Sequence, residues 1–273
     1  MRNMRNIGGC VGVVMVVAMW SAVAMAQEVR VIYVGETQSG AWHGVQLGQK
    51  EANILGRFTG QTYAVEPMSF QTLQEPDMTT PPVAVLAAAD AEKLRLLSAK
   101  FAPLGVAVFN VASDDDALRQ ACLPNLLHMP PSARMKADAV AQWRQKHPDA
   151  QVQAQAWHSD FKKFAARDLN NRFRKDHNVP MDDAAWAGWA ALKMLSETIA
   201  RTQSTDPKRV LAYLREELEF DGQKGVPHTT RDTGQLRQPL LIVEAGKLLG
   251  EAPVRGVADS TDLDSLGLAA CAK

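Results

Sequence analysis

The feature that most constrains this chain is an alternation of short β-rich runs and helix-like segments between residues 29 and 109. The runs have the length of buried strands, and the segments between them space their apolar residues as helices do. The expected strands are Val29–Val34, Tyr63–Met68, Val83–Ala87 and Gly105–Phe109, and the expected helices are Trp42–Leu55 and Ala91–Phe101. This alternation predicts an α/β fold with a parallel sheet and right-handed crossovers.

A parallel sheet of this kind binds ligands beyond the carboxyl ends of its strands. Here those ends are the segments Gly35–Trp42, Ala87–Asp90 and Asn110–Asp114. The sequence therefore places a ligand site, if the protein has one, at a single edge formed by these three loops.

Residues 1–26 have the pattern of a secretory signal. Arg2 and Arg5 precede the uncharged apolar run Ile7–Trp20, and Ala24-Met25-Ala26 is a small-x-small cleavage site. The run is short for a membrane anchor, which needs about 20 apolar residues, so we expect cleavage after Ala26. Without the two arginines, 28 basic residues stand against 30 acidic ones, a net charge of −2. That balance argues against a nucleic-acid-binding protein.

Two cysteines, Cys122 and Cys271, lie beyond the expected cleavage site. An exported chain with two cysteines is typical of one disulfide in an oxidising compartment. We favour this pairing, which would tie the C-terminal tail to the first half of the chain. Two unpaired buried thiols are the alternative.

The middle of the chain continues with helical patterns. Asp114–Asp116 reads as a helix N-terminus, where carboxylates are favoured by the dipole, in preference to a metal site. Ser132 is expected to cap a helix that ends near His147-Pro148, and Trp157–Phe173 reads as a further helix.

The pattern of residues 180–225 predicts two helices followed by a glycine-containing loop. Asp182 or Asp183 can cap the first helix, and Asp206-Pro207 opens the second. Trp186 and Trp189 on the first helix are interpreted as core residues, the alternative being that they cover an exposed partner surface. Gln238–Glu244 is expected to be a strand of a final hairpin.

Several later segments together resemble type I periplasmic solute-binding proteins of ABC transporters, the receptors of branched-chain amino acids. The resemblance is greatest to a subgroup associated with pyrroloquinoline-quinone (PQQ)-dependent alcohol oxidation. The segments that carry it are LRQACLPNLLHMPPSARMKADAVAQW, AWHSDFKKFAARDLNNRF, MDDAAWAGWAALK, GQLRQPLLI and LDSLGLAAC.

The resemblance implies two lobes with a ligand cleft between them, but this chain is short for such a protein. Only His147–Gln155 stands where relatives have most of the second-lobe sheet. We therefore expect one complete Rossmann-like lobe with a parallel sheet and one reduced lobe. The expected divisions are a leader (1–26), a first lobe (27–147), a reduced second lobe (148–250) and a tail (251–273).

The resemblance also implies ligand residues in the strand-end loops. Small hydroxyl residues and backbone N–H groups after the third and fourth strands hold the ligand in amino-acid receptors, and the matching positions here include three alanines without side-chain donors. This argues against an amino acid as the ligand. The candidate ligand residues are Ser39, Trp42, Ala88, Asn110 and Ser113.

No pattern in the sequence indicates an enzyme. The six histidines are scattered, and HExxH, GxSxG, CxxC, Walker and GxGxxG motifs are absent from the sequence. We expect no catalytic residue, no metal and no cofactor.

Two functional hypotheses remain. The first is a periplasmic receptor that binds a small solute non-covalently for an ABC permease linked to PQQ-dependent alcohol oxidation. The second is a truncated receptor fold that serves as an accessory protein, engaging a periplasmic PQQ-dependent dehydrogenase or a second copy of itself as a homodimer. A rise in melting temperature with a solute separates them, because only a ligand of the native state stabilises it.

Overall fold

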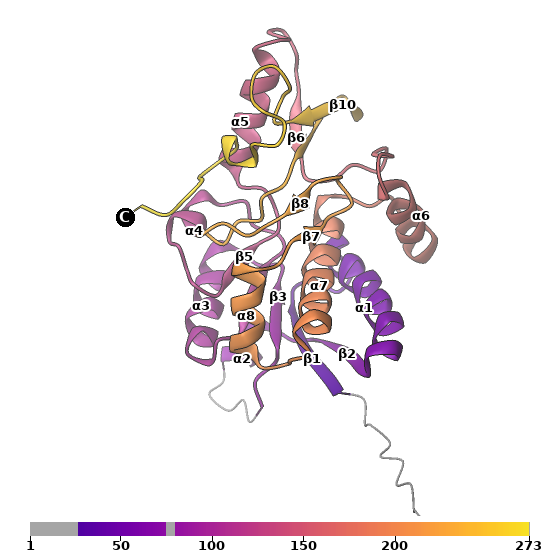
Figure 1. Ribbon diagram of the computed structural model, residues 1–273, viewed down its shortest axis with the longest axis vertical. Coiled ribbons are helices and arrows are strands. Elements are labelled where there is room, and N and C mark those ends of the chain that lie inside the picture. The colour runs from indigo at the N-terminus through magenta and orange to yellow at the C-terminus, as the bar shows by residue number, and fades with distance from the viewer. Residues whose placement is uncertain (1–26, 75–79, 273) are drawn as a thin grey trace, which may run out of the picture.

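The larger part of the molecule is built on a five-stranded parallel sheet in the order β2-β1-β3-β4-β5 (Figure 1). The computed structural model describes residues 27–74 and 80–272. The strands are β1 (Gln27–Val34), β2 (Gln61–Pro67), β3 (Ala84–Ala87), β4 (Ala107–Asn110) and β5 (Leu126–His128). The parallel sheet predicted from the alternating pattern is thus confirmed.

Helices cover both faces of this sheet. On β1, Val29, Val31 and Tyr33 face one core, while Ile32 and Val34 face the other, as the period of two requires. The first core is shared with α1 (Gly40–Thr59), α6 (Ala166–His177), α7 (Asp183–Thr202) and α8 (Pro207–Glu216). The second core is shared with α2 (Phe70–Gln74), α3 (Ala91–Phe101) and α4 (Asp116–Gln120), and the 3-10 turn η1 (Ala102–Leu104) follows α3.

Helices α1 and α7 approach each other closely at two glycines. A Cβ atom on Gly44 would lie 1.9 Å from the carbonyl oxygen of Ala185, and one on Gly188 would lie 2.1 Å from that of Ala41. Only glycine permits this backbone contact. Trp186 and Trp189 of α7 are fully buried, in agreement with the interpretation of both as core residues.

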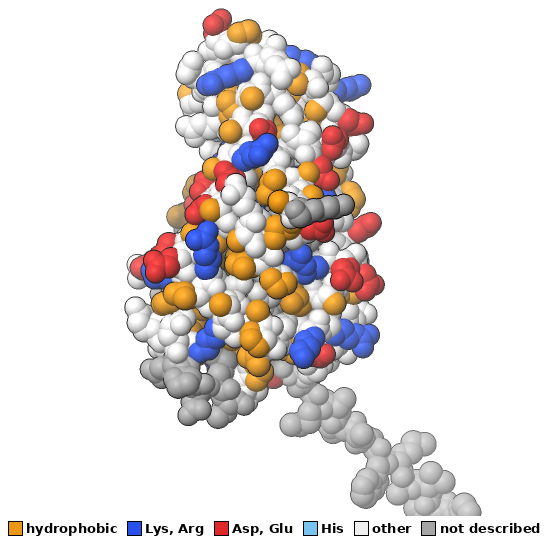
Figure 2. All heavy atoms as spheres, turned by 90° about the vertical axis from the view of Figure 1, so that its left-hand side faces the viewer, with side chains coloured by type: hydrophobic (Ala, Val, Ile, Leu, Met, Phe, Trp, Pro, Cys, Tyr) orange, Lys and Arg blue, Asp and Glu red, His pale blue; other side chains and the backbone are white. Residues whose placement is uncertain are grey.

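The smaller part contains a three-stranded antiparallel sheet in the order β10-β9-β6. Its strands are β6 (Gln153–Gln155), β9 (Leu240–Glu244) and β10 (Lys247–Ala252), and α5 (Ala133–Arg144) covers them. Two short strands, β7 (Phe220–Asp221) and β8 (Pro227–His228), and the turn η2 (Leu263–Ser265) complete the chain. In the space-filling view the smaller part stands above the larger body across a narrower waist (Figure 2). A complete first lobe and a reduced second lobe are therefore present.

The predicted lobe boundaries differ from the way the structure divides the chain. Helix α5 lies before residue 147 but packs on the small sheet, while α7 and α8 lie within 148–250 but pack on the large one. The tail is not separate either, because β10 runs to Ala252 and Leu266 joins the small core. The chain crosses between the two parts more than once. The local spacing of apolar residues does not indicate on which part a helix packs, so these crossings could not be predicted.

Two local predictions also need correction. Residues Trp157–Phe164 form a loop, and the helix begins at Ala166; their helical spacing comes from packing of Trp157 and Phe161 into the core. The strand β5 was not predicted, since it is three residues long. The predicted leader, residues 1–26, lies outside the described residues. In the described part of the chain, no helix is long and apolar enough to cross a membrane.

Candidate functional site

A cavity of about 450 Å³ opens at the carboxyl edge of the large sheet. Its walls come from the loops that follow three neighbouring strands, β1, β2 and β3, so it lies where ligands of parallel sheets bind. Its volume is within the range of small-molecule sites. The lining residues are Val34, Gly35, Glu36, Thr37, Pro67, Met68, Ser69, Phe70, Gln71, Ala88, Ala89 and Lys93.

The cavity combines apolar walls with charged and polar groups at its rim. Lys93 projects from the first turn of α3 and pairs with Asp90 at 2.9 Å. Hydrogen bonding to this carboxylate raises the pKa of Lys93, so its ammonium stays charged. Across the cavity, the side chains of Glu36 and Gln71 are exposed and have no hydrogen-bond partner among the described residues. These groups can bind the polar end of a solute whose apolar body lies against Met68 and Phe70.

Of the five predicted ligand residues, only Ala88 lines this cavity. Ser39 is instead the N-cap of α1, accepting a hydrogen bond from the Trp42 backbone N–H at 3.3 Å. The Trp42 ring lies against Tyr33, with ring centroids 4.9 Å apart. Burial raises the pKa of Tyr33, and its hydroxyl lies 3.2 Å from the Ser39 Oγ. Ser39 and Trp42 do not line the cavity, but their contacts support the β1–α1 loop, which does.

Asn110 has a structural role in place of the predicted ligand contact. Its Oδ1 accepts from the backbone N–H groups of Ala112 and Ser113, at 3.1 and 2.8 Å. Its Nδ2 donates to the Ser113 carbonyl at 2.7 Å and to His128 Nδ1 at 3.1 Å. The amide is thus saturated within the protein. Ser113 accepts from the Asp115 N–H at 3.3 Å and does not reach the cavity either.

A second cavity of about 350 Å³ lies where the end of β6 meets the α6–α7 connection. Asp183 is on its wall and accepts a hydrogen bond from the Trp157 backbone N–H at 2.7 Å. Burial raises the pKa of the Asp183 carboxyl. Its neighbour Asp182 caps α7 and lies against Gly40, where a Cβ atom would be 2.7 Å from the carboxylate. Through Asp182 this cavity therefore adjoins the start of α1.

Buried hydrogen bonds at the waist fix the segment that leads into β9 against the carboxyl end of β5. The Arg119 guanidinium is 1% exposed and donates to Gln235 Oε1 at 2.9 Å and to the carbonyls of Ser113, Asp115 and Pro130. Gln235 in turn donates to the His128 carbonyl at 3.2 Å. Burial lowers the pKa of Arg119 to about 10. This network could not be predicted from the sequence, since its members are far apart along the chain.

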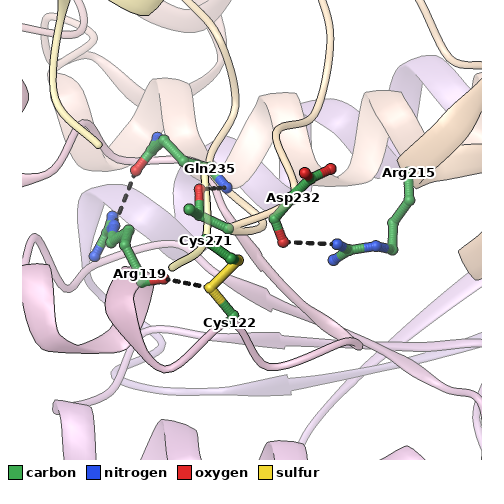
Figure 3. The surroundings of a disulfide bond; sticks show 7 residues. Arg119, Cys122, Arg215, Asp232, Gln235 and Cys271 are labelled. Carbon is green, nitrogen blue, oxygen red and sulfur yellow. Dashed lines mark hydrogen bonds between the residues drawn. A yellow bond between two sulfur atoms is a disulfide. The ribbon is translucent and has the colours of Figure 1, made fainter. Parts of the chain in front are cut away.

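A disulfide between Cys122 and Cys271 closes the same region (Figure 3). It is the pairing favoured from the cysteine count. Figure 3 shows it beside the Arg119–Gln235 hydrogen bond, with the Cys122 Sγ near the Arg119 carbonyl. The C-terminal tail is further held by Asp264, which pairs with Arg231 at 2.8 Å and with Arg237 at 2.9 Å.

A metal centre has no support within the described ranges, where no three His, Cys, Asp or Glu side chains are grouped to hold an ion. His128 and His228 are buried, and burial lowers the pKa of both, that of His228 to about 3. Both imidazoles are therefore neutral at physiological pH.

No protein-family model matches the chain, and no curated protein matches its sequence. Solved structures do match its fold. One is a branched-chain amino acid ABC transporter periplasmic ligand-binding protein from Burkholderia xenovorans LB400, with a TM-score of 0.70 and 11% identity over 82% of this chain and 95% of that one. Another is a solute-binding protein from R. palustris in complex with benzoate, with a TM-score of 0.68 and 10% identity over 90% and 99%.

A leucine-binding protein from Thermotoga maritima MSB8 matches with a TM-score of 0.65 and 10% identity, over 82% of this chain and 98% of that one. At such identities the likeness shows the fold alone. The reduced second part is consistent with the 273-residue length. The chain has the α/β fold of type I periplasmic binding proteins, with a parallel five-stranded sheet.

Proposed function

We propose that this protein is the periplasmic substrate-binding component of an ABC-type transport system and that it holds a small solute non-covalently in the strand-end cavity. The observation that carries this proposal is the cavity of about 450 Å³ bounded by the loops after β1, β2 and β3. Its apolar walls and its rim of Glu36, Gln71 and Lys93 fit a solute with a polar end and a compact apolar body. No covalent step is involved.

The ligands bound by proteins of similar fold guide the choice of solutes. Benzoate is bound by a solute-binding protein from R. palustris and 3,4-dihydroxybenzoic acid by one from Rhodopseudomonas palustris BisB5. Leucine is bound by an ABC transporter substrate-binding protein from Desulfitobacterium hafniense. Each of these molecules joins a carboxylate to an apolar body. A carboxylate in this cavity would face Lys93, the cation on its wall.

The link to PQQ-dependent alcohol oxidation is a further part of the proposal and rests on the sequence resemblance. For this reason the binding test includes short alcohols, their acids, PQQ and lanthanide ions, in addition to amino acids and aromatic acids. An ABC permease is then the expected partner, and export through the leader accounts for a periplasmic location.

A second candidate function is favoured by one observation. The small part has a three-stranded sheet, so it offers little surface to close over a solute. The protein would then be an accessory protein for a periplasmic PQQ-dependent dehydrogenase, without solute transport, acting alone or as a homodimer.

Thermal unfolding of residues 27–273 with each probe tests the receptor function. We expect one solute class to raise the melting temperature by several degrees, because a ligand at about 100 times its Kd stabilises the native state by about 2.7 kcal/mol. The Ala88→Leu variant fills the cavity and should abolish the shift. Ala117→Leu adds the same side chain at an exposed position of α4 and should retain it.

If the Ala88→Leu variant retains the rise in melting temperature, the solute binds at a place other than this cavity. No shift with any probe, combined with a stable dimer in light scattering, would support the accessory function instead.

A further inference from the structure

One wall of the strand-end cavity contains a methionine. Met68 lies between β2 and α2 and lines the cavity. Its side chain is only partly buried and packs on one side against the second core, which the sheet shares with α2 and α3. The side chain of Met68 therefore lies between this core and the open cavity.

The backbone on both sides of Met68 is fixed, so the residue stays at this wall. Its N–H donates to the Tyr33 carbonyl at 2.8 Å, and the preceding Pro67 is paired with Tyr33 in the β1–β2 ladder. The following Ser69 stabilises the start of α2, because its Oγ accepts from the Thr72 N–H at 3.1 Å. A movement of Met68 into the core would break these contacts.

The other methionines of the described residues are sealed from solvent. Met129 and Met135 are 0% exposed, Met194 is 1% exposed and Met181 is 2% exposed. A reagent in solution reaches such side chains only when the structure opens locally or globally. Met68 differs from these four because a cavity reaches it in the folded protein.

No free thiol competes with Met68 within the described ranges, because Cys122 and Cys271 form a disulfide. A thiolate is otherwise the first target of a peroxide, and a thioether is the next sulfur group that a peroxide oxidises. In the folded protein, Met68 is therefore the accessible sulfur nucleophile of the part that the structure describes.

We propose that Met68 is a site of oxidation by hydrogen peroxide and that this modification lowers the affinity of the cavity for its solute. A lone pair of the sulfur attacks one oxygen of the peroxide, and the O–O bond breaks as the S–O bond forms. The departing hydroxide takes the proton of the new S–OH group and leaves as water. The sulfur is thus oxidised to the sulfoxide, and the peroxide is reduced to water.

The modification changes the wall that the solute contacts. In the receptor function proposed above, on which this step rests, the apolar body of the solute lies against Met68 and Phe70. Oxidation converts the flexible apolar side chain of Met68 into a polar one. The sulfoxide oxygen loses water when an apolar body covers it and gains no hydrogen bond in return, which costs free energy. A weaker affinity for such a solute follows.

Peptide mass spectrometry of residues 27–273 after treatment with hydrogen peroxide tests the modification site, and it needs no solute. Met78 lies outside the described residues, so the protein carries Met78→Leu to keep its oxidation from being counted with that of Met68. We expect Met68 to gain an oxygen atom at least about tenfold faster than the four buried methionines. In urea, where burial is lost, the rates at all these positions should agree within about twofold.

Isothermal titration measures the effect on the cavity, with benzoate, 3,4-dihydroxybenzoic acid and leucine as the probes. We expect the Kd of a probe that binds to rise about tenfold once Met68 is oxidised. The Met68→Leu variant keeps an apolar wall without sulfur, so its own Kd should change by less than about twofold on treatment. Met129→Leu removes a buried methionine and should leave the response to peroxide intact.

The inference is overturned if Met68 in the folded protein oxidises no faster than the four buried methionines. It is also overturned if the affinity for a probe survives complete oxidation of Met68, or if treatment weakens binding to Met68→Leu as much. If no probe binds the untreated protein, the receptor function fails for these solutes. The oxidation rates then still decide whether Met68 is the modification site.

Discussion

The two sheets of this protein are stabilised in different ways. The five-stranded sheet is covered on both faces by helices and buries two apolar cores. The three-stranded sheet has one short helix, α5, against it and a much smaller core. Apolar burial therefore accounts for the stability of the larger part. The smaller part reaches the main core through Leu241 of β9, and with so small a core of its own it depends more on additional contacts.

Those additional contacts are buried hydrogen bonds at the waist and one disulfide. Arg119 is bonded to Gln235, and Gln238 is bonded to the Met129 carbonyl at 2.7 Å and to Lys224 at 2.7 Å. The difference between the two parts teaches that a small three-stranded sheet can be held on a larger body by directional polar contacts. Removing one partner breaks all of its hydrogen bonds at once. Single substitutions at the waist should therefore lower the free energy of unfolding more than substitutions elsewhere.

The largest effect is expected for Arg119→Ala. Four acceptors lose a buried charged donor, and hydrogen bonds to charged groups are worth about 1.5–3 kcal/mol each without being additive. We expect the free energy of unfolding in urea to fall by about 4 kcal/mol. Arg134→Ala is the control, since its exposed guanidinium is 3.9 Å from Asp138, and it should cost less than about 0.5 kcal/mol. A loss below about 1 kcal/mol for Arg119→Ala would mean that the waist does not depend on this network.

A smaller but still large effect is expected within the larger part, for Gly44→Ala. Alanine improves helix propensity by about 1 kcal/mol, but its Cβ would lie 1.9 Å from the Ala185 carbonyl oxygen. Separation of α1 from α7 should cost more than this gain, and we expect a net loss of about 3 kcal/mol in urea unfolding.

Gly48→Ala tests whether the backbone contact is the cause. At this position the added Cβ would lie 3.1 Å from the Leu192 Cβ and 3.3 Å from the Trp189 carbonyl oxygen, so the two helices need to move apart by only a few tenths of an ångström. The change should stay within about 1 kcal/mol of the unmodified protein. Equal losses at both positions would show that general crowding, and not the close contact at Gly44, limits this interface.

The same contrast explains what could be predicted from the sequence. The parallel sheet and the helix Ala91–Phe101 were predictable because their apolar residues follow local periods of two and 3.6. The assignment of α7 and α8 to a lobe was not, because it depends on contacts such as Gly44 with Ala185. Of the candidate ligand residues expected at the strand ends, Ala88 lines the strand-end cavity. The hydrogen bonding of Asn110 within the protein could not be predicted, since its partner His128 belongs to a strand too short to detect.

The smallest expected effect is a pH dependence that arises at the waist, from Lys224. Its Nζ donates to Gln238 Oε1 at 2.7 Å and to the Pro239 carbonyl at 3.3 Å, and lies 3.9 Å from the centroid of the Trp186 ring. It thus joins α7 of the larger part to the start of β9 in the smaller one. Burial lowers the pKa of Lys224 from 10.5 to about 7.

Between these two values the unfolded chain binds a proton at Lys224 that the folded protein does not. Over the single unit from about pH 7 to about pH 8, the free energy of unfolding should therefore rise by at most about 1.4 kcal/mol. Lys224→Met should lack this component, whereas Lys162→Met, at an exposed position, should retain it. Urea unfolding across this pH range compares the three proteins. An unchanged slope in Lys224→Met would show that the ammonium is solvated in the folded protein, and the stability of the waist would then depend on Arg119, Gln238 and the disulfide without a contribution from the Lys224 charge.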